Sequence, residues 1–203
     1  MAKKKSSNIG EMTARDALIV VDVQKDFCPG GALGVPGGDE VVPVINRLQE
    51  LFTTVIFSRD WHPPGHVSFS DKPKFVDGSW PKHCLAGSDG AAFHPQLQVP
   101  LHATVLSKAT KKDREAYNVF EAGDLAQTLR NQQIERLFVA GLATNYCVKE
   151  TVLAGLKEGF RVVVVSDASR GLDIPKGAVK KALQEMSKAG VLIVESKELP
   201  RSV

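Results

Sequence analysis

Residues 17–23 read A-L-I-V-V-D-V, an apolar and largely β-branched run that contains one carboxylate, Asp22. A continuous apolar run of this length is typical of a strand buried on both faces, as in a parallel sheet. Runs of the same kind follow at residues 53–57, 103–106, 136–140, 161–165 and 191–194. The sequence therefore predicts about six strands.

Amphipathic segments separate these runs. Helices are predicted over residues 39–52, 124–131, 145–158 and 177–189. In the first of them, Val42, Ile45 and Leu48 recur at the spacing of one helical face. Strands that alternate with helices predict an α/β fold, in which a mostly parallel sheet is covered by helices on both sides.

The length of 203 residues suits one domain, which we place at residues 14–203. Residues 1–13, with Lys3, Lys4 and Lys5, are predicted to be a disordered basic tip. Within the domain, residues 61–101 show no helical or strand pattern but many Pro, Gly, His and Trp residues. A loop of this length is usually functional or disordered, and its aromatic and His content favours a functional insertion for metal and substrate.

The charge and the cysteines limit the cellular context. The formal charge is only +3, and no aromatic-rich basic stripe accompanies it, so we expect no nucleic-acid partner. No apolar run is long enough to span a bilayer, and the N-terminal segment lacks the apolar core of a secretory signal. Cys28, Cys84 and Cys147 are an odd number of thiols, which favours a reduced, cytoplasmic protein.

Three chemically active side chains follow different predicted strands. Asp22, Lys108 and Cys147 come after the first, third and fourth strands, and ligands of open parallel sheets bind beyond such strand ends. A thiol in the first turn of a helix is expected to have a lowered pKa. Each residue also has an ordinary structural interpretation. Asp22 could organise a loop, Lys108 could be a surface cation, and Cys147 could be a buried structural cysteine. Together they fit an activated nucleophile with its base and cation.

A second group suggests a metal. In D-W-H, Asp60 and His62 lie on the same side of an extended segment, and His83 supplies a third ligand where the chain returns. One carboxylate and two imidazoles suit Zn²⁺, Fe²⁺ or Mn²⁺. His66 is a candidate fourth ligand, or a group that contacts the ligands. A lone histidine is more often a surface or capping residue, so this motif by itself leaves both interpretations open.

Five motifs occur in the order of a known family. They are D-V-Q-K-D-F at residues 22–27, R-D-W-H-P at 59–63, W-P-K-H-C at 80–84, S-K-A at 107–109 and G-L-A-T-N-Y-C-V at 141–148. This set resembles the nicotinamidase/pyrazinamidase branch of the isochorismatase-like hydrolases, over residues 16–195.

The resemblance implies a three-layer α/β/α sandwich and hydrolysis of nicotinamide to nicotinate and ammonia, in NAD salvage. It implies the triad Asp22, Lys108 and Cys147, and one divalent metal, Zn²⁺ first and Fe²⁺ or Mn²⁺ as alternatives. The metal would be bound by Asp60, His62 and His83 and would hold the pyridine-ring nitrogen. Further implied groups are an oxyanion hole of the Ala143 and Cys147 N–H groups beside a cis bond between Leu142 and Ala143, and an aromatic pocket with Phe27 and Trp80.

Two departures from the family pattern stand out. Asn145 occupies a position that is often Asp, and we expect little effect because both residues cap a helix start. The segment K-K-D-R at residues 111–114 is more charged than the usual family pattern and lies where the rim of the substrate pocket is expected. Tyr117, three residues further on, is another candidate for substrate binding.

Three other functions are alternatives to a nicotinamidase or pyrazinamidase. A carbamoyl amidase of the same superfamily typically lacks the metal set, and an isochorismatase proper generally lacks the nucleophilic Cys147. A catalytically silent binding protein on this scaffold would not need the full triad. The sequence leaves open the metal, the preferred aromatic amide, and the oligomeric state, a homo-oligomer included.

Overall fold

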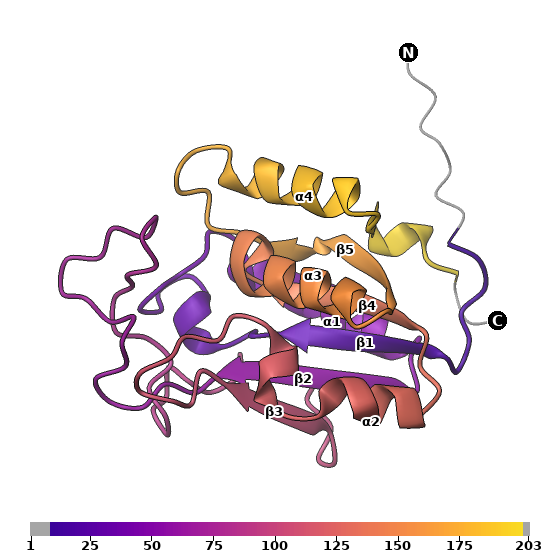
Figure 1. Cartoon of the computed structure of the whole chain (residues 1–203), viewed down its shortest axis with the longest axis horizontal. Helices are drawn as coiled ribbons and strands as arrows, with labels where there is room; N and C mark the ends of the chain where they lie inside the picture. The colour runs from indigo at the N-terminus through magenta and orange to yellow at the C-terminus, as the bar shows by residue number, and fades with distance from the viewer. Residues whose placement is uncertain (1–8, 201–203) are drawn as a thin grey trace.

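A parallel six-stranded sheet runs through the middle of the molecule (Figure 1). The computed structural model describes residues 9–200. The strands are β1 (Asp16–Val21), β2 (Thr54–Asp60), β3 (Thr104–Lys108), β4 (Arg136–Leu142), β5 (Arg161–Arg170) and β6 (Leu192–Val194). They lie in the order β3-β2-β1-β4-β5-β6, and each pair of neighbours is parallel. The predicted sheet is confirmed.

Helices cover both faces of the sheet. They are α1 (Val41–Gln49), α2 (Leu125–Asn131), α3 (Lys149–Lys157) and α4 (Ala178–Lys188). Helix α1 covers one face of the sheet, and α2, α3 and α4 cover the other (Figure 1). The buried side chains of these helices belong to the two corresponding cores. This arrangement confirms the α/β/α sandwich. Within residues 9–200, no helix combines the length and the apolarity that crossing a membrane requires.

The central strand shows why its sequence is continuously apolar. Leu18 and Val20 belong to the core on the α1 side, whereas Ala17, Ile19 and Val21 belong to the core on the opposite side. Successive side chains of a strand point to opposite faces, so a strand covered on both sides buries every residue. All six residues of β1 are buried.

Short helical turns complete the elements. Turns of 3₁₀ type span Lys25–Phe27, Gly38–Glu40, Val119–Ala122 and Ser196–Glu198, and a π-helical turn spans Thr144–Val148. The predicted helix over residues 145–158 is therefore a π turn followed by α3. The predicted helix over residues 39–52 is shorter in the structure, where a 3₁₀ turn replaces its start and a turn at residues 50–51 follows its end.

The order of the strands reverses at β1, and this creates the crevice for the site. β2 lies on one side of β1 and β4 on the other, and such a switch point is where open α/β sheets bind ligands. Gly141 permits the close approach of β4 to β1. Its φ is +117°, and a Cβ atom there would lie 2.1 Å from the carbonyl oxygen of Val21.

The insertion at residues 61–101 contains no helix or strand, as predicted. Isolated bridges hold it instead, pairing His62 with Leu85 and Phe69 with Trp80. The N–H of His62 donates to the carbonyl of Cys84 at 3.0 Å, which brings the two histidine-bearing segments together.

Part of the predicted N-terminal tip packs against the domain. Ile9 is buried, and the buried guanidinium of Arg136 donates to the carbonyls of Ile9 and Glu11 while it pairs with Asp16 at 2.6 Å. For residues 9–13 the structure thus differs from the predicted disorder, because these carbonyls satisfy a buried cation. Residues 1–8 of the predicted tip lie outside the described residues.

Candidate active site

Asp22 follows the last residue of β1 and is completely buried. Its φ of 49° lies in the left-handed region, which Asp tolerates better than most residues. The hydroxyl of Ser58, on β2, donates to Asp22 Oδ1 at 2.7 Å, and the Asp22 N–H donates to the Ser58 carbonyl at 3.2 Å. Burial raises the pKa of Asp22, and the charge of Lys108 opposes this. The net rise brings the pKa of the Asp22 carboxyl closer to the pH at which it would exchange a proton.

Lys108 ends β3 and lies between two carboxylates and the thiol. Its Nζ is 2.8 Å from Asp22 Oδ2 and 3.2 Å from Cys147 Sγ, and it also pairs with Asp60. Burial by itself would lower the pKa of Lys108, but the charges of Asp22 and Asp60 raise it well above its ordinary value. The ammonium therefore stays charged although it is out of water.

Cys147 lies in the π-helical turn, close to both of these groups. One ligand oxygen of Asp22 lies within 4.8 Å of the sulfur. The side chain is buried, and burial raises the pKa of the thiol well above its ordinary value, with Lys108 offsetting only part of this. The predicted lowering of the pKa is wrong, because desolvation outweighs the helix terminus. The structure brings the three predicted residues together with a protonated thiol.

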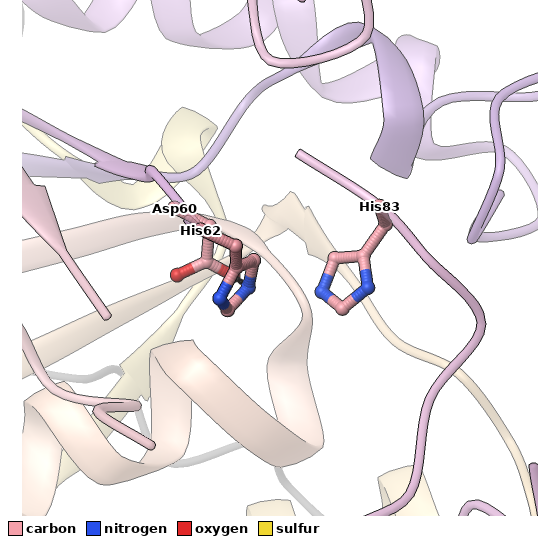
Figure 2. A group of neighbouring side chains, drawn as sticks. All are labelled: Asp60, His62 and His83. Atoms are coloured by element: carbon pink, nitrogen blue, oxygen red, sulfur yellow. Dashed lines mark ion pairs between the residues drawn. The ribbon is translucent and has the colours of Figure 1, made fainter. Parts of the chain in front are cut away.

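Asp60, His62 and His83 converge beside this group. Asp60 ends β2, His62 follows two residues later, and the ring of His83 is turned toward them from a separate segment (Figure 2). Their nearest ligand atoms all lie within 4.8 Å of one another, and all three residues are buried. Burial would raise the pKa of Asp60, but Lys108 and His62 lower it below its ordinary value, so the carboxylate is ionised.

This donor set fits a divalent metal. Both ring nitrogens of His62 are buried and have no hydrogen-bond partner among the described residues, and Nε2 lies 3.6 Å from Asp60 Oδ2. A buried nitrogen without a partner is costly, and a metal bond would satisfy one of the two. His83 Nδ1 hydrogen-bonds to the Pro81 carbonyl at 2.7 Å, which orients the ring with Nε2 free.

His66 is buried beside His62 and makes other contacts. The centroids of the two rings are 4.3 Å apart. His66 Nδ1 lies 2.8 Å from Ser68 Oγ, and Nε2 lies 3.1 Å from the Arg114 carbonyl. Both of its nitrogens therefore have partners, and His66 supports the metal group rather than offering a free ligand atom.

A cavity opens onto Cys147. The predicted pocket residues Phe27, Trp80 and Tyr117 all line this cavity. Trp80 Nε1 donates a hydrogen bond to Tyr117 Oη at 3.0 Å. Ala143 also lines it, next to the cis peptide bond between Leu142 and Ala143. The full lining is Phe27, Leu33, Val35, Asp60, Trp80, His83, Glu115, Tyr117, Ala143, Tyr146, Cys147 and Leu172. A largely apolar lining with several aromatic side chains suits a small aromatic ring.

Several supporting residues had no role assigned to them from the sequence. Gln24 is completely buried and pairs its side-chain amide with both backbone groups of Asp60, at 2.8 and 2.7 Å. Ser58 holds Asp22, and Tyr146 packs edge-to-face on Trp80 with ring centroids 4.8 Å apart. The sequence signal for Gln24 was a polar residue within an otherwise apolar strand end. Ser58 and Tyr146 carry no such signal, because only their spatial neighbours give them a role.

Asn145 does not cap a helix, contrary to the prediction. The turn that contains it has no side-chain cap. Instead, Asn145 Nδ2 donates to the Leu172 carbonyl at 2.9 Å, and the Leu172 N–H donates to Asn145 Oδ1 at 3.1 Å. The side chain is thus committed to a contact between two elements.

The parallel sheet, with its polar cluster at the point of strand reversal, defines an α/β protein, and the match to the isochorismatase domain shows that the chain belongs to the isochorismatase family. The model of the isochorismatase domain matches residues 16–198. Its relatives within the family include several nicotinamidases. The nicotinamidase of Escherichia coli is 41% identical over 198 residues, which cover 87% of this chain and 93% of that protein.

Solved structures of a pyrazinamidase and of a nicotinate-bound protein are similar to this chain as well. The pyrazinamidase of Pyrococcus horikoshii in complex with zinc is 42% identical, with a TM-score of 0.79 over 89% of this chain and 99% of that chain. PnC1 of L. infantum in complex with nicotinate is 30% identical, with a TM-score of 0.84 over 95% of this chain and 99% of that chain.

Proposed function

We propose that this chain is a nicotinamidase that hydrolyses nicotinamide, and also pyrazinamide, to the carboxylate and ammonia. The observation that carries this function is the contact of Lys108 Nζ with both Asp22 and Cys147, at 2.8 and 3.2 Å, beside an aromatic cavity. The similarity to nicotinamidases over nearly the whole chain supports the same substrate class. The product nicotinate would enter NAD salvage, in the cytoplasm.

In the first half-reaction, Asp22 takes the proton of Cys147 as the sulfur attacks the carboxamide carbon. Because burial holds the resting thiol protonated, proton removal and attack are coupled. The negative charge that develops on the carbonyl oxygen is accepted by the N–H groups of Ala143 and Cys147. Asp22 then protonates the leaving nitrogen. The C–N bond breaks, ammonia leaves, and a thioester of Cys147 remains.

In the second half-reaction, Asp22 takes a proton from a water molecule, which attacks the thioester carbon. The C–S bond breaks and the sulfur recovers a proton from Asp22, which restores the resting state with release of the carboxylic acid product. Lys108 keeps Asp22 oriented throughout and compensates its charge while it is ionised.

Asp60, His62 and His83 would bind one divalent metal, for which Zn²⁺ is our first choice and Fe²⁺ or Mn²⁺ are alternatives with the same ligand preferences. When bound, the metal supplies a Lewis-acid site for the pyridine-ring nitrogen and so orients the ring. Phe27, Trp80 and Tyr117 would enclose the ring, with His66 supporting the metal ligands. The partner of the protein is thus a small aromatic amide.

Ammonia release from nicotinamide tests this function directly. We expect turnover by the unaltered protein and loss of turnover in Cys147→Ala. Cys28→Ala is the matched control, because Cys28 is a buried thiol that does not line the cavity, and it should retain activity. Near-normal turnover by Cys147→Ala would rule the mechanism out. Hydrolysis of carbamoyl compounds in place of nicotinamide would favour the rival amidase function.

A further inference from the structure

Asn145 joins two walls of the cavity. It precedes Tyr146 and Cys147 in the π-helical turn, and both of these line the cavity from one side. Leu172, which Asn145 contacts, lines the cavity from the loop that joins β5 to α4. The two residues are 27 positions apart in sequence, so this contact is tertiary.

The contact is a two-point clamp, in which the side-chain amide of Asn145 pairs with the backbone N–H and carbonyl of Leu172. The Leu172 carbonyl also accepts from the Ile174 N–H at 2.8 Å. Asn145 and Leu172 are both buried, so water does not compete strongly for these groups. A buried hydrogen bond is costly to leave unmade, and the clamp therefore fixes the position of Leu172.

The packing around the clamp leaves little freedom. A Cβ atom on Gly171 would lie 2.8 Å from Asn145 Oδ1 and 2.6 Å from a methyl group of Val179. A larger residue at position 171 would therefore force Val179 or Asn145 to move. Val179 belongs to α4, so the start of this helix lies next to Gly171.

The clamp also needs an amide at position 145. One side-chain atom faces a donor and the other faces an acceptor, and only an amide offers both. An ionised carboxylate offers acceptors alone, so it would keep the bond from the Leu172 N–H and place a negative oxygen against the Leu172 carbonyl. Aspartate at this position would therefore release one of the two contacts.

Resting on the proposed hydrolysis of an aromatic amide, we propose that Asn145 is a positioning residue that fixes Leu172 as a wall of the substrate cavity and so limits which ring-substituted aromatic carboxamides bind. Leu172 reaches the ring of the substrate, whereas Asn145 acts through Leu172. Loss of the clamp loosens substrate binding more than it slows the chemical steps, because the nucleophile itself is untouched.

The test compares Asn145→Asp, Asn145→Ala, Leu172→Ala and the double variant Asn145→Asp/Leu172→Ala. Asn131→Asp is the matched control, since Asn131 is an exposed residue at the end of α2. We measure KM and kcat for nicotinamide and for each of its ring-methylated forms. We also measure hydrogen exchange of the peptide that contains Leu172.

Leu172→Ala should raise the relative kcat/KM for at least one ring-methylated amide by about tenfold or more, since one methyl group in an apolar pocket is worth roughly 10- to 200-fold. Asn145→Asp, which loses one of the two hydrogen bonds, should favour the same compound by about three- to tenfold, and Asn145→Ala, which loses both, should favour it at least as much. They should raise the nicotinamide KM more than they lower kcat, and should speed exchange at Leu172. The double variant should match Leu172→Ala, and Asn131→Asp should match the unaltered protein.

The role of Asn145 would be overturned if both Asn145 variants kept the wild-type selectivity among the amides and the wild-type rate of hydrogen exchange at Leu172. Full additivity in the double variant would do so as well, because it would mean that Asn145 does not act through Leu172. If the unaltered protein released no ammonia from nicotinamide, the proposed function would fail separately. Hydrogen exchange at Leu172 would then decide whether the clamp exists.

Discussion

Lys108 Nζ lies 2.8 Å from Asp22 Oδ2, and both side chains are completely shielded from solvent. An ion pair in this environment is strongly coupled, because water does not screen either charge. Lys108 also pairs with Asp60, so a single ammonium contacts the carboxylate of the candidate triad and the carboxylate of the candidate metal site.

Lys108→Met should impair both stability and activity. It leaves Asp22 and Asp60 buried without a cation, and we expect the free energy of unfolding to fall by about 3–5 kcal/mol. We expect kcat to fall at least about a hundredfold, because Asp22 loses its orientation and the charge that keeps it ionised. Urea unfolding and ammonia release measure the two effects. Lys181→Met is the control, since that side chain is 78% exposed; similar losses in both variants would contradict a specific role of Lys108.

Ser58→Ala should slow the chemistry without removing any triad residue. It deletes the hydroxyl that donates to Asp22 Oδ1 at 2.7 Å. Loss of a hydrogen bond to a charged group should lower kcat by about tenfold. Ser107→Ala deletes a hydroxyl that accepts from Arg59 outside the cavity and should leave kcat unchanged. Unaltered kcat in Ser58→Ala would show that Asp22 does not depend on this contact.

Metal removal should affect substrates according to their ring nitrogen. After chelation, we expect the KM for nicotinamide to rise by at least about tenfold, or roughly 1.4 kcal/mol of binding. Benzamide lacks the ring nitrogen and should change much less. Steady-state kinetics before and after chelation, followed by restoration with Zn²⁺, Fe²⁺ or Mn²⁺ separately, measure this effect and rank the metals. An equal rise in KM for both amides would mean that the metal does not hold the ring nitrogen.

Cys28 should make stability depend on pH in the alkaline range. Burial, with a smaller contribution from the charge of Asp39, raises the pKa of Cys28 from 9.0 to about 11. Below the unfolded pKa, both states keep the proton and stability is unaffected. Between the two pKa values, the unfolded state loses the proton first, so the free energy of unfolding falls as the pH rises. Urea unfolding across this range should give a shallower fall for Cys28→Ala; parallel curves would contradict the raised pKa.

The fold was predictable from the sequence because its signals are local. Residues 17–23 are apolar at every position but one, and β1 is buried on both faces. The helical spacing of Val42, Ile45 and Leu48 likewise corresponds to the buried face of α1. The insertion at residues 61–101 was predictable from the lack of such periodicity. The helix starts were less predictable: the turn at Thr144–Val148 is π-helical, and its geometry depends on what it packs against.

The sequence by itself determined in which order strands and helices follow one another along the chain. It also determined which residue types lie at the ends of the strands. Hydrophobic periodicity records which face of a local element meets the core. The tertiary structure alone decided that Lys108 joins Asp22 to Asp60, that desolvation keeps the Cys147 thiol protonated, and that Asn145 binds Leu172 and does not cap a helix. Those outcomes depend on distances and burial among side chains far apart in the chain, and no local pattern encodes either quantity.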